Sequence, residues 1–310
     1  MLKKMLKKFY HSLVKYYKRI IIFPRAKKNP KWITDKMYKK IFKVPINYEN
    51  PKSINEKIHW LKFYSDTTLW SVLTDKIKVR EYVTEKGFGM ILNKIYKVYQ
   101  KIDDIDISDL PWSFVMKTNN GCWDILIVDD KKNFSNERIK IYFRKKIAEE
   151  HGVMLWEYHY RKIKPLIFAE KLLQENNKKW LTDYKFYCYN GEIKYVTVIY
   201  ERTEKWFTMC TYDMKWNHMK NVDIESKYQI LGKGIKRPAS LNRMVEICRR
   251  LSEDIPFVRI DLYEINEMPM FGEMTFTPAG GFLKCYTSDF LDELGAPIKL
   301  QSSYSTMYKD

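Results

Sequence analysis

Two carboxylates near the C-terminal end, Asp261 and Glu273, lie in segments whose alternating apolar and polar residues predict a β-hairpin. In the first segment Arg259 and Asp261 share one face. A short connection centred on Glu267 places Asp261 opposite Glu273, and Arg259 opposite Thr275. Facing carboxylates repel one another unless a cation lies between them, and Mg²⁺ prefers oxygen ligands. The pair therefore predicts a magnesium site, with salt bridges to side chains such as Arg259 as the alternative.

The segments that must position this hairpin have the patterns of helices and of paired strands. Ser53 and Glu56 form a capping-box pattern, and Gly87 is expected to end the next helix. Turn signals at residues 119–121 and at Asn190-Gly191 predict two further hairpins. The expected helices cover residues 53–64, 74–86, 133–160 and 240–252. The expected strands cover residues 112–118, 123–128, 166–173, 184–189, 193–200, 257–264 and 270–276. The predicted fold class is therefore α+β.

Composition restricts the compartment and the partners. The 310 residues include 56 Lys and Arg against 38 Asp and Glu, a formal charge of +18 that attracts phosphates, acidic glycans, anionic lipids or nucleic acid. The five cysteines are widely spaced and form no C-x-x-C pair, which argues against a disulfide framework or a zinc site. The longest early apolar run, residues 20–23, is too short for a signal segment or a membrane span. We expect a cytoplasmic protein, either free or peripheral on the inner face of a membrane.

The N-terminal region is strongly basic. Residues 1–43 carry 15 Lys or Arg and one acid, Asp35, and their apolar residues recur at helical spacing. A helix is expected to stop before Pro24. Residues 1–22 are predicted to bind an anionic membrane surface, or else to form a peripheral helix packed on the body. We treat residues 1–50 as a basic helical extension.

The segment at 271–281, an acid-bearing strand that runs into a Pro/Gly turn, is one of several that resemble a known family. Five segments in order make residues 51–295 similar to the TupA-like branch of the ATP-grasp superfamily. The five segments are residues 55–62, 75–83, 114–117, 183–186 and the closing 259–278. The resemblance implies two antiparallel-sheet lobes that clamp ATP. It places helices and a small lobe in residues 51–164, and a C-terminal lobe with the metal site in 165–310.

The resemblance also implies roles for individual residues, with ATP and Mg²⁺ as cofactors. Lys76 and Lys117 would approach the nucleotide phosphates, as suits ammonium charges. Glu170 would be the hinge acid before the backbone of Lys171 and Leu172, which would contact adenine. The remaining implied roles are nucleotide or substrate contacts for Asp183 and Lys185, contacts to the acceptor carboxylate for Arg202, Arg259 and residues 278–281, and metal ligation by Asp261, Glu273 and Thr275. The alternatives are a surface position for Lys117 and a simple salt bridge for Asp183 and Lys185.

Two departures from the family pattern affect expected activity. The glycine-rich turn over the phosphates reads Asn119-Asn120-Gly121-Cys122-Trp123, so Trp123 replaces a glycine and stiffens the lid. The usual Glu-x-Asn metal motif ends in Thr275, whose hydroxyl is expected to bind magnesium more weakly. Reduced activity or a changed nucleotide preference would follow.

The reaction implied by the family is amide formation through an acyl phosphate. A substrate carboxylate attacks the γ-phosphorus, and an amine then displaces phosphate, so the protein supplies positioning and charge rather than a nucleophile. The expected partner is an acidic or amino-bearing glycan or amino acid, in the setting of surface-polysaccharide synthesis.

Two other functions remain open at this point. The acids of Asp104-Ile105-Asp106 could hold the metal of a nucleotide sugar in a glycosyltransferase, although the acid-rich surroundings favour a solvated loop. The basic charge could belong to a membrane or nucleic-acid adaptor without catalysis. No nucleic-acid-binding motif accompanies that charge, so nucleic acid is not an expected partner.

Overall fold

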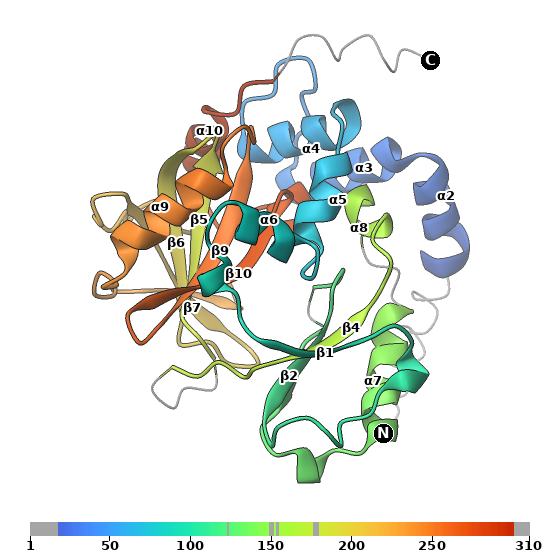
Figure 1. Ribbon diagram of the computed structural model, residues 1–310. Helices are drawn as coiled ribbons and strands as arrows, with labels where there is room; N and C mark the ends of the chain where they lie inside the picture. The colour runs from blue at the N-terminus through green and yellow to red at the C-terminus, as the bar shows by residue number, and fades with distance from the viewer. Residues whose placement is uncertain (1–17, 123, 149–151, 153–154, 176–179, 301–310) are drawn as a thin grey trace, which may run out of the picture.

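Two separate sheets organise the chain (Figure 1). The structure is a computed structural model that describes residues 18–122, 124–148, 152, 155–175 and 180–300. The smaller sheet and the larger sheet each have their own buried apolar cluster. The protein therefore has two lobes, as the family resemblance implies.

The smaller sheet has four strands in the order β1-β4-β2-β3, and all neighbouring strands are antiparallel. Helix α7 (Asn136–Ile147) covers this sheet with its fully buried Ile139 and Phe143. The strands are β1 (Ile95–Tyr99), β2 (Phe114–Thr118), β3 (Leu126–Val128) and β4 (Ile167–Glu170).

The larger sheet has six strands in the order β10-β9-β5-β6-β7-β8, antiparallel except for the parallel β7–β8 pair. Its strands are β5 (Asp183–Tyr189), β6 (Glu192–Tyr200), β7 (Phe207–Asp213), β8 (Gln229–Leu231), β9 (Val258–Ile265) and β10 (Met268–Thr275). Asn190 and Gly191 both have positive φ, which suits the tight β5–β6 turn predicted from this Asn-Gly pair.

The two faces of the larger sheet differ in polarity. Val258, Ile260 and Leu262 of β9 are fully buried in the cluster that also contains the apolar side of α9 (Leu241–Leu251). Figure 1 shows α9 lying along β5 and β6. Arg259 and Asp261 alternate with these apolar residues and therefore point to the other face. The polar face of this sheet carries the candidate site.

The remaining helices enclose the larger lobe. Helix α4 begins at the predicted capping box, in which Ser53 and Glu56 satisfy each other's backbone N–H groups. The other α-helices are α2 (Phe23–Lys28), α3 (Pro30–Phe42), α4 itself (Ile54–Tyr64), α5 (Thr68–Thr74), α6 (Val79–Glu85), α8 (Tyr158–Arg161) and α10 (Ser288–Gly295). The short 3₁₀ or π segments are η1 (Lys18–Ile22), η2 (Gly89–Ile91), η3 (Ile102–Asp104), η4 (Lys131–Asn133) and η5 (Pro278–Gly281).

Two helix predictions were wrong in their bounds. The helix expected over 74–86 begins only at Val79 as α6, because the Asp75 side chain accepts hydrogen bonds from the N–H groups of Ile77 and Lys78 and forms a turn after α5. The helix expected over 133–160 ends at Ile147 as α7, and α8 is separate. The described segment η1 ends at Ile22, before Pro24 as expected, and Pro24 lies in the first turn of α2, where its missing N–H is not needed.

The two buried clusters group the chain differently from the predicted division at residue 164. Strand β4 pairs with β1 and β2, so the small sheet continues to Glu170. Helices α4 to α6 contribute Ile58, Leu73 and Val83 to the core of the larger lobe rather than to the smaller one.

The described part of the N-terminal region docks on the larger lobe. Tyr38 of α3 is buried against Phe282, while Lys36, Lys39 and Lys40 are exposed. The predicted amphipathic segment lies mostly in residues 1–17, outside the described residues. Among the helices that the structure describes, none combines the length and the apolar character needed to cross a membrane.

Candidate active site

The hairpin of β9 and β10 brings Asp261 and Glu273 opposite one another, as predicted. The cause differs from the expected connection centred on Glu267. The turn is the two-residue Asn266-Glu267, both with positive φ, and a β-bulge between Phe271 and Glu273 then shifts the register by one. The bulge requires Gly272, because a Cβ there would lie 2.8 Å from the carbonyl oxygen of Asp261. The same register places Arg259 opposite Thr275.

Both oxygens of Asp261 are occupied by cations of the chain. Arg259 Nε lies 2.7 Å from Oδ1 and its Nη2 lies 2.7 Å from Oδ2, and Lys185 also donates to Oδ2. Burial raises the pKa of Asp261, but Arg259 and Lys185 outweigh burial and bring that pKa below its usual value. Asp261 is therefore a buried, ionised carboxylate held by a guanidinium and an ammonium group.

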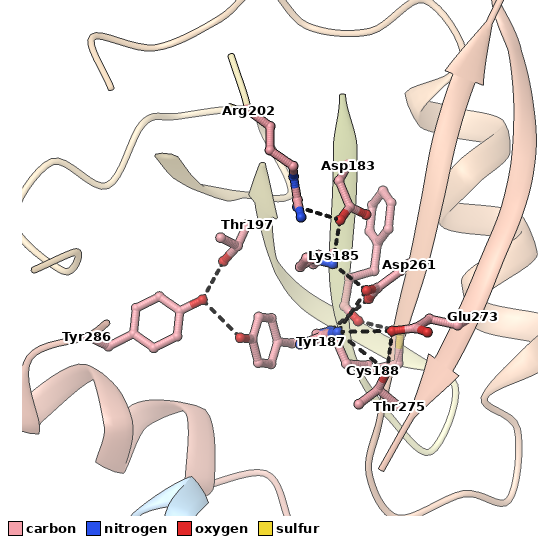
Figure 2. A network of polar contacts seen from close by, with 12 residues as sticks. Asp183, Lys185, Tyr187, Cys188, Thr197, Arg202, Asp261, Glu273, Thr275 and Tyr286 are labelled. Atoms are coloured by element: carbon pink, nitrogen blue, oxygen red, sulfur yellow. Dashed lines mark hydrogen bonds and ion pairs between the residues drawn. The ribbon is translucent and has the colours of Figure 1, made fainter. Parts of the chain in front are cut away.

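The ion pairs continue on both sides of Asp261 (Figure 2). Lys185 Nζ lies 2.6 Å from Oδ2 of Asp183, which in turn lies 3.4 Å from Nη2 of Arg202. On the other side Arg259 Nη2 lies 3.7 Å from Oε1 of Glu273. The result is a charge chain of alternating sign, which we define as Arg202–Asp183–Lys185–Asp261–Arg259–Glu273.

The donor set beside this chain suits magnesium in chemical type. Asp261 and Glu273 are adjacent carboxylates, and the Thr275 hydroxyl donates to Glu273 Oε1 at 3.2 Å. A fourth oxygen, Oδ1 of Asp183, is buried without a hydrogen-bond partner among the described residues. No three His, Cys, Asp or Glu side chains gather into a metal-binding group in the described part of the chain. The alternative, in which the acids are held by salt bridges, also describes the contacts seen, so metal ligation stays a prediction.

A cleft between the two lobes contains seven of the predicted site residues, namely Lys76, Lys117, Glu170, Lys171, Leu172, Asp183 and Arg202. Its other lining residues are Arg80, Asn93, Val115, Ile125, Ile127, Phe168, Leu173, Trp180, Leu181, Tyr263, Phe271 and Gly272. The cleft thus has basic groups from both lobes and reaches the charge chain through Asp183 and Arg202. Lys185, Arg259, Asp261, Glu273 and Thr275 do not line it, and the ion pairs of the charge chain connect four of them to it.

Lys117 and Glu170 are partners across the small sheet. Lys117 Nζ lies 2.5 Å from Oε1 of Glu170, with both side chains mostly buried. Glu170, the acid that interrupts an apolar strand, is therefore paired with a cation, as a buried carboxylate requires. Lys117 is not the isolated surface lysine of the alternative interpretation.

The predicted phosphate lid is tied to Lys76. The Lys76 side chain donates to the carbonyl oxygen of Gly121, and its backbone N–H donates to the carbonyl of Asn119 at 3.0 Å. Gly121 has no space for a side chain, because a Cβ would lie 2.0 Å from Oδ2 of the buried Asp124. Trp123, the departure in this turn, lies outside the described residues.

The predicted adenine contacts differ between Lys171 and Leu172. The backbone N–H of Lys171 donates to the carbonyl of Lys94 at 2.8 Å, and its carbonyl accepts from the Asn93 side chain at 2.8 Å. An adenine bonded to Lys171 would compete with these bonds. Leu172 is the better candidate of the two.

A row of hydroxyl groups continues from the charge chain along the polar face of the larger sheet (Figure 2). The Tyr286 hydroxyl lies 2.9 Å from that of Tyr187 and 2.7 Å from that of Thr197. Thr197 continues to Thr211 at 3.1 Å, and Thr211 donates to Asp223 at 2.7 Å. Cross-strand pairing places Lys185 opposite both Asp261 and Thr197, so the row and the charge chain belong to one polar face.

A second buried ionic group supports the turn after β10. Lys62 Nζ donates to the carbonyl oxygens of Leu155 at 2.5 Å and Gly280 at 2.9 Å. Burial lowers the pKa of Lys62 to about 8, although the carboxylate of Glu157 opposes the shift. Glu157 accepts from the Thr277 hydroxyl at 2.6 Å. These contacts hold the 278–281 turn, whose role as a contact for the acceptor carboxylate stays a prediction.

Several residues at the site had not been singled out from the sequence. Gly272 is an isolated glycine in a strand pattern, which often marks a β-bulge. The predicted register did not take this bulge into account. Arg80, Asn93, Lys62 and Glu157 have no local signature, because their partners lie far away in sequence.

The Asp-x-Asp alternative has a structural use instead. Asp106 accepts hydrogen bonds from Ser108 and Asn136, and Asp104 accepts from the backbone of Lys101. Neither acid lines the cleft between the lobes. The solvated-loop interpretation therefore accounts for this pair.

Two sheet-based lobes facing a lysine-bearing cleft, with acids on the last hairpin, form the arrangement of ATP-grasp proteins. The family model for TupA-like ATP-grasp matches residues 56–299. The chain therefore belongs to the TupA-like ATP-grasp family. This assignment confirms the resemblance and the fold class predicted from the sequence.

Solved structures with similar folds are distant from the chain. They include a D-alanine–D-alanine ligase from Bacillus anthracis (14% identity, TM-score 0.41, 73% of this chain and 66% of that one). ATP-grasp ligase PsnB (11%, 0.42, 76% and 64%) and an L-amino acid ligase from Bacillus licheniformis (13%, 0.44, 83% and 57%) are further examples. The chain thus spans less than two thirds of the length of these proteins. No curated protein sequence matches it.

Proposed function

We propose that this chain is an ATP- and magnesium-dependent carboxylate–amine ligase that forms an amide through an acyl phosphate. The observation that carries the proposal is the pairing of Asp261 with Glu273 on a charge chain that reaches the cleft through Asp183 and Arg202. A nucleotide in this cleft would place its phosphates between Lys76 and Lys117 on one side and these acids on the other.

The chain's own residues would act by charge and position. Lys117 would approach the phosphates from the small lobe and Lys76 from the connection between α5 and α6, and Arg259 would present its guanidinium to an acceptor carboxylate. Arg202 is a further candidate for that carboxylate, because it lies at the cleft and its one ion pair within the described residues, to Asp183, is 3.4 Å long. Asp261, Glu273 and Thr275 would hold magnesium, which when bound neutralises phosphate charge.

The acceptor is proposed to be an acidic or amino-bearing glycan or amino acid used in surface-polysaccharide synthesis. The basic groups at the cleft support an anionic substrate. The pathway itself is inferred from the family resemblance.

The test is ATP-dependent phosphate release by the full chain with magnesium and a panel of sugar acids and amino acids. Asp261→Asn is expected to abolish release, whereas Asp104→Asn, a matched control outside the cleft, is expected to leave it unchanged. Phosphate release by Asp261→Asn at the wild-type rate would refute the proposal. Turnover of a UDP- or GDP-sugar instead of ATP would favour the glycosyltransferase.

We also propose that residues 1–22 bind an anionic membrane surface from the cytoplasmic side. In the described part Ile20 and Ile21 are about half exposed, and the following helices present exposed lysines. Co-sedimentation with vesicles containing phosphatidylglycerol, but not with phosphatidylcholine alone, is expected. Equal binding to both vesicles, or to neither, would contradict this partner.

A further inference from the structure

The charge chain is electrically complete without any bound ion. It contains three cations and three carboxylates in alternating order, and each member pairs with its neighbours in the chain (Figure 2). Asp261, at its centre, is 2% exposed. A divalent cation placed beside Asp261 would therefore approach an ammonium and a guanidinium group in a region poor in water.

The two cations on Asp261 are held differently. Arg259 grips both carboxylate oxygens with its planar fork and also donates to Thr275 at 3.4 Å, so its position is fixed by geometry. Lys185 is a point charge on a flexible stem, and its partners are the carboxylates of Asp183 and Asp261. Because Asp183 lines the cleft, the ammonium group of Lys185 lies one side chain away from the space proposed for the nucleotide.

We propose that Lys185 is an internal counter-ion that keeps Asp261 closed to divalent cations until an anionic phosphate group enters the cleft. Phosphate then offers Lys185 a new partner, and the carboxylate oxygen that it leaves becomes available to the metal. This role rests on the proposed function and goes beyond it, because it makes binding of the metal depend on the nucleotide through a residue of the chain. Lys185 is a positioning residue in this scheme.

The proposed role of Lys185 predicts a change in metal binding that would not occur if nucleotide phosphates alone created the metal site. If Lys185 blocks the site, its removal must improve metal binding in the complete absence of nucleotide. Simple bridging of the metal by phosphates would leave nucleotide-free binding unchanged. The metal alone is therefore the informative probe.

The experiment measures Mn²⁺ binding to the nucleotide-free full chain by the paramagnetic resonance signal of free Mn²⁺. Wild-type protein is compared with Lys185→Met, with Lys185→Arg, which keeps the charge, and with Lys194→Met. Lys194 pairs with Glu192 on the neighbouring strand β6 and serves as the matched control. Lys185→Met is expected to bind Mn²⁺ tighter than wild type by a factor in the range of about 5 to 150. Lys185→Arg and Lys194→Met are expected to resemble wild type.

Two outcomes overturn the inference. One is a folded Lys185→Met protein, judged by circular dichroism, that binds Mn²⁺ no tighter than wild type. The other needs no variant, and so applies even where Lys185→Met does not fold. It is a wild-type chain that binds Mn²⁺ equally well with and without a non-hydrolysable ATP analogue. A separate titration of that analogue with Mn²⁺ present tests the proposed function, because a chain that does not bind the nucleotide fails there first.

Discussion

The two buried ionic groups of the larger lobe differ in what their charges contact. Lys62 donates to two backbone carbonyls and has the Glu157 carboxylate as its counter-charge. In the charge chain, by contrast, the contacts of Lys185 are to carboxylate side chains. A backbone carbonyl cannot leave its place without moving a turn, whereas a carboxylate can exchange one cation for another. The comparison indicates that the first group stabilises the fold and that the second is built for exchange.

The largest effect should come from breaking the structural group. Lys62→Met removes the donor to Gly280 and the counter-charge of Glu157, so we expect a loss of about 3 kcal/mol in the free energy of unfolding. Denaturant titration measures it, with Lys40→Met on the exposed side of α3 as the control. A loss no larger than that of the control, or smaller than the loss for Lys185→Met, would reverse the comparison.

The next effect concerns the turn that Lys62 supports. Gly281 has φ +85°, and an added Cβ would lie 3.0 Å from the ring of His59, so Gly281→Ala is expected to cost about 2 kcal/mol. Gly87 has φ +90° with open space around it, and Gly87→Ala should cost only about 1 kcal/mol of backbone strain. The difference between their melting temperatures isolates the contacts with His59 and Ile58. Equal losses would mean that the packing under the turn is loose.

Local patterns in the sequence predicted the secondary structure where the deciding contacts are themselves local. The Ser53–Glu56 capping box and the Asn190-Gly191 turn are examples, because each is completed within a few residues. Local patterns can fail even at short range. The Asp75 side chain accepts a hydrogen bond from the Ile77 N–H and forms a turn where a helix was predicted. The Lys62–Gly280 contact joins residues 218 positions apart, and no periodicity reports such a pair.

The candidate site shows the same division. Alternation along β9 correctly predicted that Arg259 and Asp261 share a face, and the family pattern pointed to the residues that line the cleft. The register of Asp261 with Glu273 was right for an incomplete reason, because the bulge at Gly272 had not been recognised. The ion pairs of Lys185 could not be predicted, because they depend on how three strands align.

A smaller effect on stability, with a large effect on activity, is expected for Arg259→Lys. Lysine keeps the charge but cannot contact both oxygens of Asp261, so about 1 kcal/mol of stability should be lost. Phosphate release should fall by about 100-fold, because the guanidinium is proposed to meet the acceptor carboxylate. Arg249→Lys on the exposed side of α9 is the control in both assays. Unchanged phosphate release would remove Arg259 from the proposed reaction. It would also weaken the view that the charge chain is built to exchange one cation for another.

The smallest loss of stability is expected at Asp223, the end of the hydroxyl row. Burial raises the pKa of Asp223 to about 6, above its usual value of 3.8, although Thr211 donates two hydrogen bonds to it. The folded state therefore binds the proton more tightly than the unfolded state. The contribution of Asp223 to stability is present below about pH 4 and is lost as the pH rises to about 6. Asp223→Asn should remove this slope from the measured pH dependence of unfolding.

Below about pH 4, where the Asp223 carboxyl group is protonated, the same substitution should change stability by less than about 1 kcal/mol, because an amide can keep both contacts to Thr211. The amide nitrogen would donate where the carboxylate accepted, and the hydroxyls of Thr197, Tyr286 and Tyr187 can each reverse direction to follow it. A matched control is Asp213→Asn, because the pKa of Asp213 is lowered and its loss should leave the slope between pH 4 and 6 in place. If Asp223→Asn instead lowered stability as strongly as Lys62→Met, the hydroxyl row would be a fixed structural group like that of Lys62. On the polar face, only the charge chain would then be able to exchange one cation for another.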